Sequence, residues 1–224
     1  FEKFPGAKDE LTTSMKSVGE AMSIGRTFKE ALQKGLRSME IGATGLGYSF
    51  RSELPDRETI LESLHRPNSK RIFSLRQAIV AGISEEEIFA VSAIDPWFIR
   101  QVRDIVEMEK RISNFGLAND MTTANAALAD MLREAKEYGF SDRQLAEMWK
   151  MPEADIRRMR KEMHVEPTYY LVDTCAAEFE AYTPYFYSTY ERGEEIKVED
   201  RRKVLILGGG PNRIGQGIEF DYCS

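Results

Sequence analysis

Cysteine and histidine are scarce in this sequence. Its 224 residues contain two cysteines, Cys175 and Cys223, and two histidines, His65 and His164. No Cys-x-x-Cys spacing and no histidine cluster occurs, so the sequence predicts neither a metal site nor a disulfide framework. The opening "FEKFPGAKDE" lacks the pattern of a signal peptide, and few cysteines fit a reducing compartment. We therefore expect a cytoplasmic protein.

Long apolar runs and an excess of positive charge are also missing. No run approaches the roughly 20 residues that a membrane-spanning helix needs. The formal net charge of −6 argues against a nucleic-acid protein overall, although it is compatible with a local basic face. With 42% hydrophobic and 30% charged residues, the chain has the composition of a globular protein with a sizeable core. We expect neither a membrane nor a nucleic acid as a partner.

Helical signals dominate the sequence from Thr27 to His164. Thr27 and Glu30 form a capping box, and the apolar residues that follow lie on one helical face until Gly42. Further capping residues, apolar stripes of period 3.6 and glycine stops predict helices over 56–65, 69–81, 84–91, 96–116, 122–138, 141–150 and 152–163. The short linkers between them indicate that neighbouring helices pack together. The sequence thus predicts a mainly α fold.

The character of the chain changes after Pro167. A tyrosine-rich stretch, "TYYLVDTCAAEFEAYTPYFYSTY", is typical of extended structure that wraps a helical body. The charged stretch "ERGEEIKVEDRRK" reads as a surface connector. The apolar run at 203–207 predicts a parallel strand buried on both faces, which needs strands beside it. We expect this run either to pair with another extended segment, of this molecule or of a neighbouring one, or to refold away from such a strand.

The glycine-rich loop "LGGGPNRIGQG" fits no standard nucleotide motif. A dinucleotide fingerprint requires glycine where Arg213 stands, and a P-loop requires Lys after Gly215, where Gln216 stands. Glycines after a buried strand can still let the backbone approach an anion or simply permit a tight turn. Both interpretations stay open from the loop alone.

Residues 141–163 resemble a helix-turn-helix with a basic second helix. The basic side chains of that helix are Arg157, Arg158, Arg160 and Lys161. Such residues could contact phosphates. Five acidic residues nearly neutralise the segment, which favours an ordinary helical hairpin. A nucleic-acid-binding module is therefore the alternative hypothesis.

Three stretches of the chain resemble the large subunit of carbamoyl-phosphate synthetase. They are "FEKFPGAKDELTTSMKSVGEAMSIGRTFKEALQKGLRSME", "VDTCAAEF" with "TPYFYSTYE", and "LGGGPNRIGQGIEFDYCS". The resemblance implies a central piece of a longer protein. It would comprise the end of the first synthetase half (1–22), a helical oligomerisation domain (23–198) and the first strand and loop of the second half (199–224). The α/β ATP-grasp halves themselves would lie outside it.

The resemblance also implies a function. The family uses two ATP, bicarbonate and glutamine-derived ammonia to make carbamoyl phosphate for arginine and pyrimidine synthesis. It works with Mg or Mn and K ions and a glutaminase small subunit. For this piece we expect no catalytic residues and no cofactor, but a homo-oligomer formed through the helical domain. By resemblance, Glu2, Gly217 and Glu219 match positions near the internal route of carbamate between the halves.

Overall fold

The predicted fold class is confirmed: the protein is mainly α-helical. A computed structural model describes residues 5–14, 16–17, 19–47, 54–118, 126–176, 178–180, 185–193, 196, 199–208 and 210–213. These residues form eight helices and two small two-stranded sheets. The helices are α1 (Phe28–Ser38), α2 (Arg57–His65), α3 (Arg71–Val80), α4 (Glu85–Ser92), α5 (Pro96–Ala118), α6 (Ala126–Glu137), α7 (Asp142–Trp149) and α8 (Glu153–Glu162). The strands are β1 (Gly19–Glu20), β2 (Thr168–Leu171), β3 (Phe186–Thr189) and β4 (Asn212–Arg213).

Side-chain caps begin the helices where the sequence predicts them. Thr27 accepts a hydrogen bond from the Glu30 amide, and Asp56 and Ser84 cap α2 and α4 in the same way. At α7, Ser141 and Gln144 form a complete capping box, in which each side chain accepts from the other's backbone amide. Each cap satisfies an amide that has no partner within its own helix.

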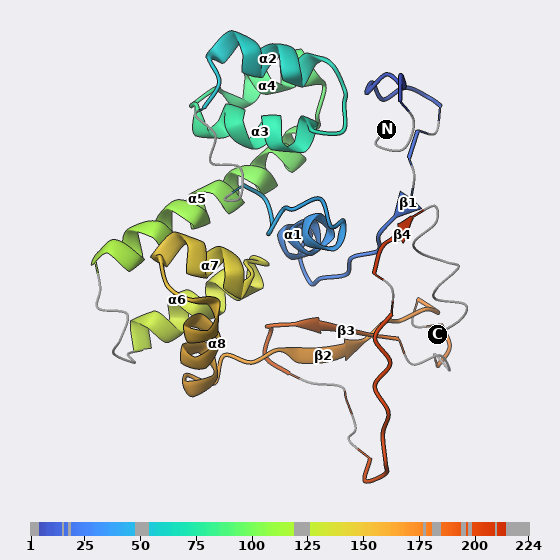
Figure 1. The fold of residues 1–224 in the computed structure, drawn as a ribbon, viewed down its shortest axis with the longest axis vertical. Helices are drawn as coiled ribbons and strands as arrows, with labels where there is room; N and C mark the ends of the chain where they lie inside the picture. The colour runs from blue at the N-terminus through green and yellow to red at the C-terminus, as the bar shows by residue number, and fades with distance from the viewer. Residues whose placement is uncertain are drawn as a thin grey trace.

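The long helix α5 is the axis of the helical body. Figure 1 shows it running between the group α2–α4 and the group α6–α8, with α1 at one side. It contacts α1, α3, α4, α6 and α7. Its core-facing stripe is 0–1% exposed and consists of Ile99, Val102, Ile105, Met108 and Ile112. Burial of this stripe on several neighbours at once makes α5 the centre of the hydrophobic core.

A glycine permits the close contact between α5 and α7. The Trp149 indole Nε1 donates a hydrogen bond to the Ile112 carbonyl at 2.8 Å. Its ring therefore lies against the backbone of α5, at Gly116, where a Cβ would be 2.0 Å from Trp149 Cδ1. Any larger residue at this position would displace the tryptophan.

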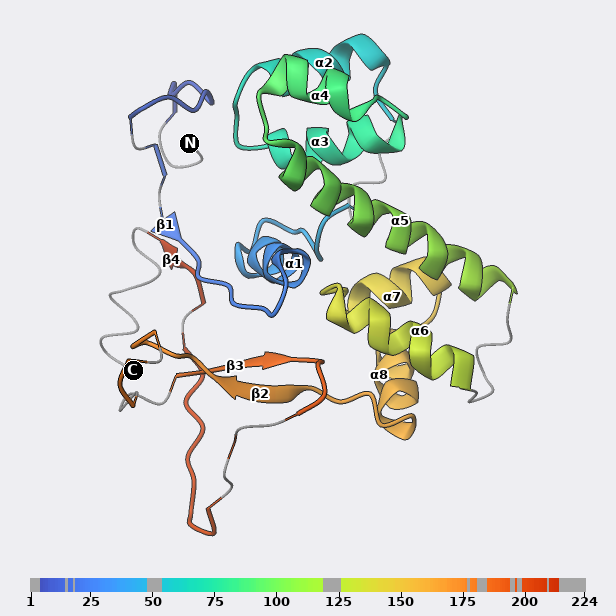
Figure 2. The ribbon, with the colours of Figure 1, turned by 180° about the vertical axis from the view of Figure 1, so that it is seen from behind.

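The tyrosine-rich stretch forms an antiparallel hairpin, as its composition indicates. Strand β2 pairs with β3, with Thr168 opposite Thr189 and Leu171 opposite Phe186. Tyr190, directly after β3, packs against the helical core. A second, smaller antiparallel pair joins β1 to β4. Both views show it beside α1 (Figures 1 and 2).

The predicted strand at 203–207 is not formed. Its four apolar side chains are 67–88% exposed, and the described residues give this run no strand partner. Within the described part of this chain the run is thus neither buried nor paired, while its pairing with a neighbouring molecule stays a prediction. Local hydrophobicity identifies a strand only if neighbouring strands exist to cover it, and here the short β4 follows instead.

The α5–α7 contact gives a first test. In an exposed helix, Gly→Ala stabilises by about 0.5–1 kcal/mol. We expect Gly116→Ala instead to lower the free energy of unfolding in urea by about 1–3 kcal/mol, because the added methyl overpacks against Trp149. In a Trp149→Leu background, which removes the ring, the same change should become neutral or stabilising. If Gly116→Ala stabilised the chain with Trp149 intact, this would contradict the close contact between Gly116 and the Trp149 ring.

Candidate functional site

The helices α7 and α8 form the expected helical hairpin, but two of the four basic side chains of α8 pair within the protein. Arg160 is buried, lies 3.1 Å from the Asp142 carboxylate and donates to the Val165 carbonyl at 3.0 Å. Arg158 pairs with Asp155 at 2.7 Å. A surface that bound nucleic acid would need these guanidinium groups free for phosphates. The geometry thus favours the structural interpretation.

The three residues predicted to line a carbamate route, Glu2, Gly217 and Glu219, lie outside the described residues. So do residues 209 and 214–217 of the glycine-rich loop. One group of Lys, Arg and Glu side chains among the described residues comes together from α1, the end of α6 and the β2–β3 hairpin with the residues after it.

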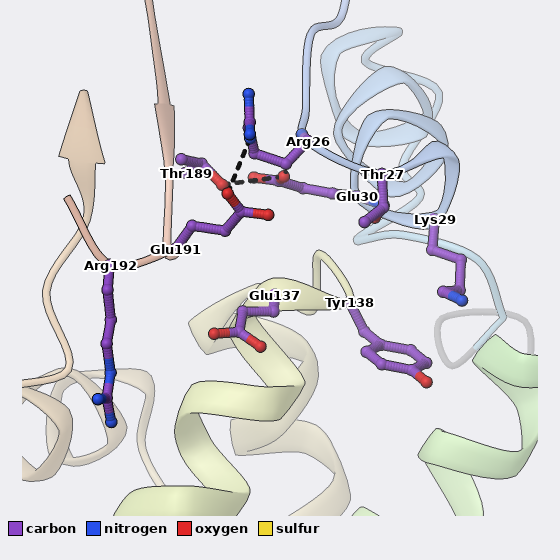
Figure 3. A pocket seen from close by; sticks show the side chains of 9 residues that line it. All are labelled: Arg26, Thr27, Lys29, Glu30, Glu137, Tyr138, Thr189, Glu191 and Arg192. Carbon is purple, nitrogen blue, oxygen red and sulfur yellow. Dashed lines mark hydrogen bonds and ion pairs between the residues drawn. The ribbon is translucent and has the colours of Figure 1, made fainter. Parts of the chain in front are cut away.

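A hollow of about 390 Å³ lies where these elements meet. It is lined by Arg26, Thr27, Lys29, Glu30, Glu137, Tyr138, Thr189, Glu191 and Arg192 (Figure 3). Three cationic and three anionic side chains contribute to this lining, so their formal charges cancel. The hollow therefore has no excess charge that would attract a strongly charged ligand.

Glu30 is the buried charge beside this hollow. Only 1% of its surface is exposed. Its Oε2 accepts from the Arg26 amide at 2.8 Å and from the Thr189 hydroxyl at 3.0 Å. Its Oε1 lies 2.8 Å from the Lys34 ammonium, one turn along α1. A buried carboxylate is tolerated only with such partners.

Lys34 is bound to the same elements as Glu30. Besides the carboxylate, its ammonium donates to the Ile24 carbonyl at 2.9 Å and to the Ser188 carbonyl of β3. The ammonium therefore has three acceptors, which lie before α1, on α1 and on β3. Two of these contacts are hydrogen bonds, whereas the contact with Glu30 Oε1 is an ion pair, and this oxygen accepts no hydrogen bond from the described residues.

Arg26 connects the start of α1 to the hairpin at the surface. Its Nε lies 2.8 Å from Glu191, and Nη1 donates to the Tyr187 hydroxyl at 3.4 Å. Its guanidinium also lies over the Tyr170 ring, 5.3 Å from the centroid. Figure 3 shows Arg26 and Glu191 facing each other beside the Glu30–Thr189 bond.

A second polar cluster lies under Tyr190. The buried Lys136 and Arg160 both bind Asp142, at 2.9 and 3.1 Å. Both cations also face the Tyr190 ring, at 5.0 and 5.7 Å from its centroid. Burial disfavours the charged form of Lys136 more strongly than Asp142 favours it, which lowers the pKa of Lys136 to about 8. Burial also raises the pKa of Tyr190.

Sequence reasoning did not identify these residues as a site. Glu30 was noted only as part of a capping box, and neither Lys34 nor Lys136 was singled out. The available signal was the i,i+4 spacing of Glu30 and Lys34 on α1. Their partners Thr189 and Ser188 are more than 150 positions away, so the sequence could not reveal them.

Comparisons with known proteins identify the family. Residues 20–164 match the family described as carbamoyl-phosphate synthetase large chain, oligomerisation domain. The chain belongs to this family. Residues 200–224 match a second description, the carbamoyl phosphate synthase preATP-grasp domain.

Curated relatives match along the whole chain. The carbamoyl phosphate synthase large chain of Nostoc sp. is 51% identical over 223 residues, and that of Synechocystis sp. is 52% identical over 224. That of Archaeoglobus fulgidus is 50% identical over 223 residues. Each alignment covers 100% of this chain but only 20% of the relative. These matches favour the oligomerisation domain over the alternative of a nucleic-acid-binding module.

The described residues offer neither a metal site nor a membrane span. Within them, no group of three or more His, Cys, Asp or Glu lies close enough to hold a metal ion. The helices among them are too short or too polar to cross a membrane.

The Lys136 cluster makes stability depend on pH. The folded-state pKa of Lys136, about 8, lies below the ordinary value of 10.5, so between these values the unfolded chain binds a proton that the folded chain has lost. The free energy of unfolding should therefore rise with pH in this window. Between pH 7.5 and 9.5 we expect a gain of about 1–2 kcal/mol relative to Lys136→Met, measured by urea unfolding.

The control for this experiment is Lys110→Met, which removes an exposed lysine from α5. It should keep the pH dependence of the unchanged chain. Identical pH profiles for the unchanged chain and Lys136→Met would contradict the lowered pKa.

Proposed function

We propose that this chain is the helical domain that joins the two synthetase halves of a larger carbamoyl-phosphate synthetase large chain and mediates its self-association. The match of residues 20–164 to the oligomerisation domain carries this proposal. The proposed divisions are 1–22 for the end of the first half, 23–198 for the helical domain and 199–224 for the start of the second half. The chain spans a fifth of the curated relatives, which leaves room for both halves.

The reaction that we propose for the whole protein follows the family. It consumes two ATP, bicarbonate and glutamine-derived ammonia, uses Mg or Mn and K ions, and works with a glutaminase small subunit in the cytoplasm. We assign no catalytic residue to this chain. Glu2, Gly217 and Glu219 are proposed to lie near the carbamate route.

The geometry supports a joining role. β1, which precedes the helical body, pairs with β4, which follows it. The two flanks of the body therefore leave it side by side (Figure 1). A domain that holds two synthetase halves together requires its connections to be fixed in this manner.

An exposed aromatic cluster is the surface that best fits self-association. Phe28 of α1 lies edge-on to Trp97 and Phe98 of α5, with ring centroids 5.3 Å apart in both pairs. Trp97 and Phe98 are 45% and 43% exposed. Aromatic side chains dominate the buried centres of protein interfaces. We therefore propose that a second copy covers this cluster.

Sedimentation equilibrium tests the proposed association. We expect a homodimer with a dissociation constant at or below about 100 μM, which corresponds to a binding free energy of roughly 5 kcal/mol. Phe98→Asp should weaken it at least about tenfold, because a charge would be buried at the contact. Phe179→Asp, at an aromatic that is exposed elsewhere, is the matched control and should leave it unchanged. A chain that stays monomeric near 100 μM would count against the proposal.

A further inference from the structure

The two chain segments that flank the helical body converge on one face of α1. The incoming segment (19–26) leads into α1, and the outgoing segment (186–192) comprises β3 and the residues after it. They are separated by about 160 positions in the sequence, yet both contact the same turn of α1. Figure 2 shows the β1–β4 pair beside α1 and the β2–β3 hairpin below it.

The incoming segment is held by three hydrogen bonds to α1. The Arg26 amide donates to Glu30, and Lys34 donates to the Ile24 carbonyl. The Ser23 hydroxyl donates to the Ala31 carbonyl at 2.8 Å. Two of these three bonds use the Glu30–Lys34 pair.

The outgoing segment uses the same two side chains. The buried Thr189 hydroxyl donates to Oε2 of Glu30, the oxygen that also accepts from Arg26. The Ser188 carbonyl accepts from Lys34, which also binds Ile24. Each group of the ion pair is thus shared by both segments.

We propose that the Glu30–Lys34 pair is a clasp that makes the incoming and outgoing segments attach to and leave α1 together. If one segment departs, it removes a partner from a carboxylate or ammonium that stays buried, which weakens the attachment of the other. The coupling between the two segments involves only residues of this chain and needs neither a second copy nor the synthetase halves. Its consequence for the enzyme rests on the proposed function, because only then would the clasp fix two synthetase halves relative to each other.

Spin-label distances can follow both segments separately. One label pair joins exposed Met22, on the incoming segment, to exposed Glu107 on α5. The other joins exposed Tyr185, directly before β3, to Glu107. The labelled positions are changed to cysteine, and Cys175 and Cys223 are replaced by serine. Dilution into unlabelled chain removes distances between molecules.

In Lys34→Met, both label pairs should lose their narrow distance peak, while circular dichroism shows that the helices remain. Arg66→Met is the matched control, because Arg66 forms an i,i+4 pair with Glu62 at an exposed site. It should leave both peaks narrow. Retention of either narrow peak in Lys34→Met would overturn the clasp.

Thr189→Val is a milder change that tests the coupling between the two segments. Thr189 donates to Glu30 and its side chain has no bond to the incoming segment. The clasp nevertheless predicts that the distance peak broadens for the label pair at Met22 as well as for the pair at Tyr185, since coupling between two sites is reciprocal. Broadening confined to Tyr185, or absent at both positions, would overturn the clasp and leave the surface contacts of Arg26 with Glu191 and Tyr187 as the link between the segments. Neither measurement depends on self-association or catalysis, so the clasp and the proposed function can fail separately.

Discussion

The arrangement of the chain around its helical body depends on one buried ion pair, Glu30 with Lys34 on α1. Removing a carboxylate and an ammonium from water is costly, and their attraction offsets the cost only if the remaining donors and acceptors are also satisfied. Here Arg26 and Thr189 donate to one carboxylate oxygen, and Ile24 and Ser188 accept from the ammonium. The other carboxylate oxygen, Glu30 Oε1, has only its ion-pair contact with Lys34. The segments that supply these groups are thereby selected over any others that could lie against α1.

Two different kinds of interaction organise the molecule. The helices pack around α5 through apolar side chains, and this part resembles any helical body with one hydrophobic core. The hairpin, in contrast, docks mainly through polar clusters: Glu30 and Lys34 on one side, and Lys136, Asp142 and Arg160 under Tyr190 on the other. Apolar burial gives stability without direction, whereas paired charges require one geometry. The paired charges accordingly fix the position of the hairpin on the helical body.

The helices could be predicted from the sequence because their signals are local. Thr27, Asp56, Ser84 and Ser141 each cap a helix within three residues of themselves. The polar clusters could not be predicted. Glu30 binds Thr189 and Lys136 faces Tyr190, and no pattern in the sequence connects the two members of either pair. The apolar run at 203–207 forms no strand for a related reason: the run itself is local, but the strands that would cover it are not. The carbamate-route residues stay a prediction, since they fall outside the described structure.

The most direct test of this account is the cost of Thr189→Val in two backgrounds. With Glu30 present, losing the hydroxyl leaves a buried carboxylate with one partner fewer, and the free energy of unfolding in urea should fall by about 2 kcal/mol. In a Glu30→Met background no carboxylate remains, so the same change should lie within about 0.5 kcal/mol of zero. Equal costs in both backgrounds would mean that Thr189 acts independently of Glu30, and would contradict the claim that this buried pair holds the outgoing segment.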